Sequence, residues 1–163
     1  MIYYYTDGAC KGNPGTGGFG IICVKDGVVE YKYSEQCEQT TNNREELKAI
    51  LHAFERSRLF PTEPTIIYSD SAYCVNMLND WIFKWANNGW KNSKKQTVEN
   101  IDLVQQLYKY LKIEFFNCQV IKVKGHNGIV ENELADALAT NDQAKYKKTL
   151  IQYGIKDPFL ENL

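Results

Sequence analysis

Apolar residues near the start of the chain form short runs that predict strands. The first run, Ile2–Thr6, is β-branched and aromatic, and it stops at the turn signal Asp7-Gly8. Two further runs, Phe19–Val24 and Val28–Tyr33, flank Asp26-Gly27, which is a strong signal for a tight hairpin loop. The three runs therefore predict an antiparallel meander, with a glycine-rich turn after the first strand.

Helical spacing of apolar residues begins after the meander. Capping residues at 40–43 precede Leu47, Ile50 and Phe54, which recur at the helical period. The pattern then predicts, in order, a helix over about 43–58, a strand over 65–68, a helix over 73–78, a helix over 101–111, a strand over 115–124 and a last helix carrying Leu134, Ala137 and Leu138. Strands joined through helices run parallel to their neighbours, so the order predicts a layered α/β fold with a mixed sheet.

Composition narrows the class of protein. The chain has 163 residues, of which 44% are apolar and 24% charged, and the net charge is -1. These values predict one globular domain without a membrane segment, and they exclude a polycation that coats nucleic acid by bulk charge. Five cysteines without a C-x-x-C pair, and a start without signal-like character, predict a reducing cytoplasm, where most cysteines behave as small buried residues.

Four acidic residues stand where predicted elements begin or end, or on the last helix. They are Asp7, Glu46, Asp70 and Asp136. Carboxylates brought to one edge of the sheet would repel by roughly 4 kcal/mol per pair at 4 Å and an effective dielectric of 20. Only cations make such a cluster reasonable, and carboxylate oxygens favour Mg²⁺ or Mn²⁺. Two such ions could clamp the attacking and leaving oxygens of a phosphodiester.

Each acid also has a simple structural interpretation. Asp7-Gly8 is a common turn, Asp70-Ser71 resembles a helix N-cap, and Asp136 could be an exposed helix residue. Glu45 and Glu46 each follow an asparagine by three residues, so either could be a capping-box glutamate. Spacing alone leaves both interpretations open.

Histidines are few, and they differ in their surroundings. His126 lies between glycines in the segment 125–128, where it could reach solvent and titrate near neutral pH, although it could also be an incidental loop residue. His52 lies between apolar residues of a predicted helix, and we interpret it as structural.

Residues 81–95, the tryptophan–lysine segment, combine aromatic and cationic side chains without an acid. The segment holds Trp81, Trp85, Trp90, Lys84, Lys91, Lys94 and Lys95. Aromatic faces and lysines suit the bases, sugars and phosphates of nucleic acid. The alternative is a solvated surface whose tryptophans merely pack against the domain.

Four motifs taken together resemble bacterial type 1 ribonuclease H over about residues 1–140. They are the segment 6–15 (TDGACKGNPG), the segment 41–47 (TNNREEL), Asp70-Ser71, and the segment 125–128 (GHNG) followed by 131–136 (ENELAD). The resemblance implies a five-stranded mixed sheet with helices on both faces. It also implies two Mg²⁺ ions and endonucleolytic cleavage of the RNA strand of RNA/DNA hybrids. Mn²⁺ could substitute for Mg²⁺ among such oxygen donors, and we expect the cleavage to give 5′-phosphate and 3′-hydroxyl ends. Residues 141–163 have no assigned counterpart and are interpreted as a tail of unknown role.

The resemblance also assigns roles to single residues. Glu46, the second acid of its motif, matches a metal ligand together with Asp7, Asp70 and Asp136, and His126 matches a histidine that activates water or assists product release. Positions that contact the RNA backbone and its 2′-hydroxyls correspond to Cys10, Asn13, Asn42 and Asn43. The tryptophan–lysine segment resembles a basic protrusion that holds the DNA strand, and Thr41 with Asn100 resembles a pocket for a DNA phosphate.

Three positions depart from the family pattern. Ala72 lacks the amide that many members use in the minor groove, Gln39 replaces a frequent cation, and Glu45 replaces a commonly apolar residue. The rival functions are a hybrid-binding module without activity and a related polynucleotidyl-transfer domain of the integrase or transposase kind. The intact acids argue against the first and the tryptophan–lysine segment against the second, and we expect a monomeric enzyme.

Overall fold

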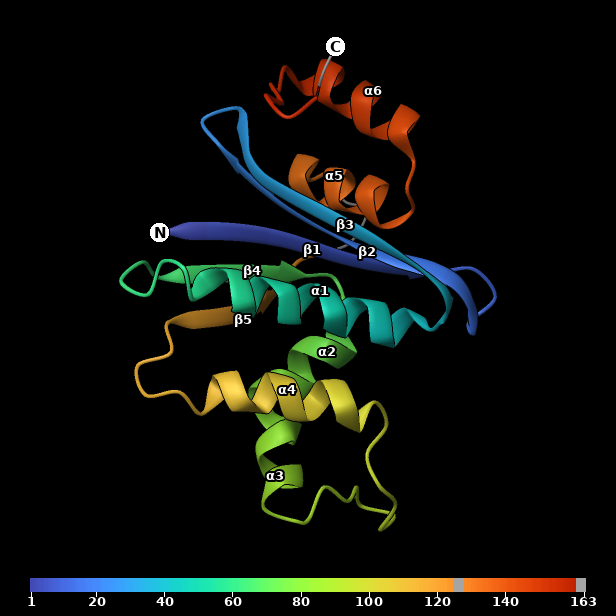
Figure 1. The fold of residues 1–163 in the computed structure, drawn as a ribbon, viewed down its shortest axis with the longest axis vertical. Helices are drawn as coiled ribbons and strands as arrows, with labels where there is room; N and C mark the ends of the chain where they lie inside the picture. Colours follow the sequence, from blue (N-terminus) through green and yellow to red (C-terminus); the bar gives the residue numbers. More distant parts are fainter. Residues whose placement is uncertain (125–127, 161–163) are drawn as a thin grey trace.

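A single mixed sheet organises the computed structural model, which describes residues 1–124 and 128–160 (Figure 1). Its strands are β1 (Ile2–Cys10), β2 (Gly15–Lys25), β3 (Val28–Thr40), β4 (Thr65–Ser69) and β5 (Cys118–Lys122), in the order β3-β2-β1-β4-β5. The pairs β1–β2 and β2–β3 are antiparallel, whereas β4 pairs in parallel with both β1 and β5. The predicted α/β fold with a five-stranded mixed sheet is therefore confirmed.

Helices cover both faces of this sheet, as the resemblance implied. They are α1 (Asn42–Ser57), α2 (Ala72–Asn76), the π-helical segment η1 (Met77–Trp81), α3 (Ile82–Ala86), α4 (Ile101–Leu111), α5 (Val130–Ala139) and α6 (Gln143–Tyr153). Side chains of β2 alternate between two hydrophobic clusters: Ile21 and Cys23 pack with α1, α2 and α4, and Ile22 packs with α5 and α6. Figure 1 shows α5 and α6 on one side of the sheet, away from α2 and α4.

The first strands are longer than the sequence pattern predicted. Asp7 lies inside β1 and pairs with Gly20 of β2, so the prediction that Asp7 ends the strand is wrong. The prediction that Gly15, Gly17 and Gly18 belong to a turn is also wrong, because β2 begins at Gly15. Glycines of β2 let a helix approach the sheet: a Cβ on Gly18 would come within 2.7 Å of the Ala139 carbonyl oxygen of α5, and one on Gly20 within 2.7 Å of the Ala135 carbonyl oxygen. β3 likewise continues to Thr40, whereas β5 is shorter than predicted.

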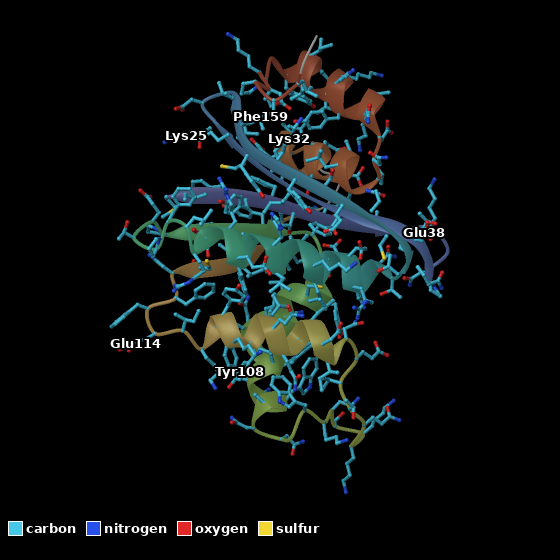
Figure 2. The ribbon with its side chains drawn as sticks, viewed as in Figure 1. Lys25, Lys32, Glu38, Tyr108, Glu114 and Phe159 are labelled. Carbon is cyan, nitrogen blue, oxygen red and sulfur yellow. The ribbon has the colours of Figure 1, made fainter. Side chains whose placement is uncertain are left out.

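Residues 141–163, interpreted from the sequence as a tail, contain the additional helix α6. Its Tyr146 and Leu150 are buried in the smaller cluster with α5. The hydroxyl of Tyr146 and the ammonium of Lys32 both donate to the buried carboxylate of Asp157, each at 2.6 Å. Figure 2 shows Lys32 and Phe159 at this end of the molecule. The helix is therefore docked firmly on the domain, and the boundary at residue 140 stays a prediction.

Within the described residues, the helices are too short or too polar to cross a lipid bilayer.

Candidate metal centre and active site

Four carboxylates from four different elements meet beside β1. Asp7 lies on β1, Glu46 on α1, Asp70 directly after β4 and Asp136 on α5. Carboxylate oxygens of Asp7, Glu46 and Asp70 lie within 4.8 Å of one another, and the Asp136 carboxyl is within hydrogen-bonding reach of Asp7. All four line one cavity of about 340 Å³. The predicted convergence of the acids is thus what the fold produces.

The local backbone explains why the acids can come so close. β1 and β4 are parallel neighbours, so Asp7 and Asp70 project from the same end of the sheet. Gly8 lets α1 approach, because a Cβ there would come within 2.4 Å of the Glu46 amide nitrogen. On the other face, Gly18 and Gly20 admit α5, which carries Asp136. Close contact between helix and strand backbones therefore builds the cluster.

Burial and mutual repulsion dominate the electrostatics of this cluster. Burial, followed by the charges of Glu46 and Asp70, raises the pKa of Asp7 far above its usual range. Burial and the charge of Asp70 likewise raise the pKa of Glu46, although hydrogen bonds from Asp7, Gly8 and Ser69 act in the opposite direction. Without a cation, the cluster is therefore stable only if it retains protons.

The donor set suits a hard divalent cation. Glu46 is 7% exposed, and among the described residues its buried Oε2 atom has no hydrogen-bond partner. A buried acceptor without a donor is costly unless a ligand completes it. The surrounding donors are carboxylate oxygens, which Mg²⁺ and Mn²⁺ prefer, so the residues present fit these ions.

The capping interpretations of the acids are wrong for α1 and α2. Thr41 caps α1 by accepting from the Arg44 amide at 3.2 Å, so the capping-box position is Arg44 and neither glutamate occupies it. Ser71 caps α2 by accepting from the Cys74 amide at 3.1 Å, which leaves Asp70 outside the cap.

Glu45 has a structural environment of its own. It is 1% exposed, and its Oε2 atom accepts from Thr40 Oγ1 and from Lys48 Nζ, both at 2.8 Å. These contacts join the end of β3 to the first turns of α1, next to the segment that carries Asn42 and Asn43. A buried glutamate at a position where the family is commonly apolar is therefore held by two partners.

Several residues expected to contact substrate lie beside the carboxylates. Cys10, Asn42 and Asn43 line the same cavity, and the Asn13 side chain accepts from the Asn42 amide at 2.9 Å. Thr41 and Asn100, the two residues expected to hold a DNA phosphate, are linked by Arg44, which donates through its amide to Thr41 and through its guanidinium to Asn100 at 3.2 Å. Their contacts with nucleic acid stay predictions.

The tryptophan–lysine segment divides into a packed part and an exposed part. Its three tryptophans are half-buried at the margin of the larger hydrophobic cluster, where Trp81 meets Tyr73 and Trp90 meets Tyr108 edge to face. Packing against the domain therefore accounts for part of the burial of the tryptophans, in line with the alternative interpretation of this segment as a solvated surface. Lys91, Lys94 and Lys95 are exposed on the loop between α3 and α4, at the end of the molecule opposite α6 (Figure 1).

The remaining predictions concern His126 and the cysteines. His126 lies outside the described residues, so its predicted role is unchanged. All five cysteines are free, but only Cys23 and Cys74 are buried, so the expectation that most are buried is wrong.

The sequence patterns also missed Lys145 of α6, whose ammonium lies 2.5 Å from Asp136 Oδ2. Nothing in the spacing of the chain links these two residues, because they lie on successive helices joined by a turn.

Comparisons with known proteins agree with this geometry. The sequence model of the RNase H family matches residues 1–144. A ribonuclease H of Acetivibrio thermocellus is 45% identical over 148 residues, covering 90% of this chain and 97% of that protein, and one of Caldicellulosiruptor saccharolyticus is 44% identical over 139 residues, covering 85% and 92%.

Solved structures show the same fold at lower identity. The solution structure of the PFV RNase H domain superposes with a TM-score of 0.70 at 22% identity, covering 95% of this chain and 96% of that one. LC11-RNase H1 in complex with an RNA/DNA hybrid superposes with a TM-score of 0.62 at 23% identity, covering 88% and 99%. From the family match and the two bacterial relatives, we conclude that this chain belongs to the ribonuclease H family.

Proposed function

We propose that this protein is an endonuclease that hydrolyses the RNA strand of RNA/DNA hybrids, giving 5′-phosphate and 3′-hydroxyl ends. The observation that carries the proposal is the cavity in which four carboxylates lie beside Cys10, Asn42 and Asn43. A phosphodiester placed there would lie close both to the acids and to the residues expected to contact RNA. The names of the relatives and the hybrid bound to LC11-RNase H1 support the same substrate.

In this proposal, Asp7, Glu46, Asp70 and Asp136 would hold two Mg²⁺ ions, for which Mn²⁺ could substitute. Such ions, when bound, neutralise charge on the phosphate and on the oxygens that attack and leave. The carboxylates fix where that neutralisation occurs, because each stands on a separate secondary-structure element or directly after one. His126 would move a proton or help the product to depart.

Residues around the carboxylates would select the substrate. Cys10, Asn13, Asn42 and Asn43 would contact the RNA backbone and its 2′-hydroxyls, the group that distinguishes RNA from DNA. Thr41 and Asn100 would hold a phosphate of the DNA strand, and the tryptophan–lysine segment would extend that grip. We further propose that the protein acts as a monomer in the cytoplasm.

A cleavage assay tests the proposal. The protein is incubated with an end-labelled RNA/DNA hybrid, duplex RNA or duplex DNA, each with Mg²⁺ or with chelator, and the new ends are identified by their response to phosphatase. We expect cleavage of the RNA in the hybrid alone, dependent on Mg²⁺. A hybrid that is bound but never cut would indicate a binding module, whereas strand transfer on duplex DNA would indicate a polynucleotidyl-transfer domain.

A further inference from the structure

Lys145 contributes a cation to the carboxylate cluster from outside the part of the chain that defines the family. Its Nζ atom lies 2.5 Å from Asp136 Oδ2 and 3.0 Å from Glu133 Oε2. The family match ends at residue 144, directly before this lysine. Its partner Asp136 is one of the proposed metal ligands, so the ion pair joins α6 to the active site.

The position of Lys145 is fixed by its helix. Asp142 caps α6 by accepting from the Lys145 amide at 3.0 Å, and the Lys145 carbonyl accepts from Thr149 Oγ1 at 2.8 Å. The next residue, Tyr146, is buried and hydrogen-bonded to Asp157, which anchors this turn on the domain. Lys145 therefore cannot move far from Asp136 while α6 stays docked.

The helix itself gives no reason for a lysine at this place. A cation in the first turn lies at the positive end of the helix dipole, where it is unfavourable. Glu133 and Asp136 supply the compensation, since their side chains are only 24% and 21% exposed. The lysine is thus held where an acidic cluster needs positive charge.

We propose that Lys145 is an internal counterion of the metal centre: it neutralises Asp136 while no metal is bound and competes with Mg²⁺ for that carboxylate. The inference rests on the proposed metal site. Removal of the ammonium leaves the metal-free cluster with more unbalanced negative charge, which destabilises it. The same removal takes away a competing cation, so Mg²⁺ binds more tightly. Lys145 is a positioning residue in this scheme, not a catalytic one.

The test uses the full chain without nucleic acid. Thermal unfolding in chelator and a Mg²⁺ titration followed by amide chemical shifts are measured for the wild type, Lys145→Met, Lys145→Arg and Lys148→Met. Lys148 lies exposed on the same helix, so its variant matches the change in net charge. We expect Lys145→Met to lower the unfolding temperature in chelator and to lower the Kd for Mg²⁺ about fivefold, at the low end of coupling between two ligands. The other two variants should resemble the wild type.

Three results would overturn the proposal: unchanged or weaker Mg²⁺ binding by Lys145→Met, an unfolding temperature in chelator equal to that of the wild type, or equal effects of Lys148→Met. If Lys145→Met does not fold, Lys145→Gln carries the same comparison. In an Asp136→Asn background, the effect of Lys145→Met on metal-free stability should shrink to the part that the remaining pair with Glu133 contributes. If the wild type shows no Mg²⁺-dependent shifts near the carboxylates, the proposed metal site fails instead, and the unfolding data still report on the ion pair.

Discussion

Gly8 of β1 and Glu46 of α1 meet backbone to backbone: a Cβ on Gly8 would lie 2.4 Å from the Glu46 amide nitrogen and 2.9 Å from its Cα. Real Cβ contacts do not occur at such distances, so a side chain at position 8 must push the strand and the helix apart. The separation of these two backbones therefore sets the separation of the Asp7 and Glu46 carboxylates.

Gly8→Ala should abolish cleavage and lower the free energy of unfolding by about 1–3 kcal/mol, the usual cost of overpacking. Gly27→Ala is the matched control, because nothing lies within 4 Å of the added Cβ, although the φ of +75° disfavours alanine. The control should lose about 1–2 kcal/mol and keep its activity. Urea unfolding and hybrid cleavage check both variants, and full activity of Gly8→Ala would contradict the argument.

The adjacent glutamates should respond differently to the same change. Glu46→Gln should remove cleavage, because it replaces a proposed metal ligand. Glu45→Gln should retain cleavage but destabilise the fold by about 1–3 kcal/mol, since it weakens the buried contacts with Thr40 and Lys48. Cleavage rates and urea unfolding are measured for both variants. Higher activity in Glu46→Gln than in Glu45→Gln would make Glu45 the metal ligand and Glu46 the structural residue.

The pH dependence of the metal-free protein follows from the raised pKa values of Asp7 and Glu46. Above pH 4, the unfolded chain releases these protons while the folded cluster keeps them, so stability falls as pH rises until the folded pKa is passed. Each such carboxyl adds to the loss of stability with every pH unit in this window. Urea unfolding in chelator at pH 5 and pH 8 should show the loss, and saturating Mg²⁺ should reduce it.

Asp7→Asn should lose cleavage while still binding the hybrid, and its stability in chelator should fall less between pH 5 and pH 8 than that of the wild type. The substitution removes a proposed ligand and also a source of repulsion. Cleavage at the wild-type rate with Mg²⁺ would remove Asp7 from the ligand set.

Local signals in the sequence predicted some elements of the fold and missed others. The helix α1 and the meander were predicted because their signals are local: alternating or helical apolar positions and an Asp-Gly loop. The ends of β1 and β2 were missed because their glycines serve contacts with α1 and α5, which sequence spacing does not reveal. The four acids could be grouped from their places at the ends of elements, but only the family motifs favoured metal ligands over turns and caps. Lys145 depends on a partner carried by another helix, so no local pattern could find that contact, whereas Glu45 pairs with Lys48 at the i,i+3 spacing of a single helix.

The exposed lysines of the tryptophan–lysine segment should contribute to binding and not to the chemical step. Alanine at Lys91, Lys94 and Lys95 should weaken hybrid binding and reduce the slope of log K against log salt by up to about 0.9 for each phosphate that the variant no longer neutralises. Alanine at Lys147, Lys148 and Lys156, also exposed, changes the net charge equally at the opposite end and should leave the slope unchanged. Binding titrations at several salt concentrations compare the two, and equal slopes would assign the segment to packing alone.

His126→Ala should slow turnover by roughly 10²- to 10⁴-fold, the range for a positioned acid or base, with little change in affinity for Mg²⁺ or for the hybrid. The proposed metal ligands are all carboxylates, so the histidine is not needed to hold the ions. Single-turnover and steady-state rates separate a role in chemistry from one in product release. Wild-type rates in both regimes would exclude His126 from catalysis.

The acids are carried by helices on both sides of the sheet, and this affects the activity of a chain that has not finished folding. Asp136 arrives with α5, which packs in the smaller hydrophobic cluster with α6, whereas Glu46 belongs to the helix of the larger one. The helices α5 and α6 follow the other elements along the chain and are synthesised after them, so a nascent or partly opened molecule with only its larger cluster formed lacks one of the four carboxylates. On the proposed function, such a molecule could not cut RNA: nuclease activity would be withheld until folding is complete.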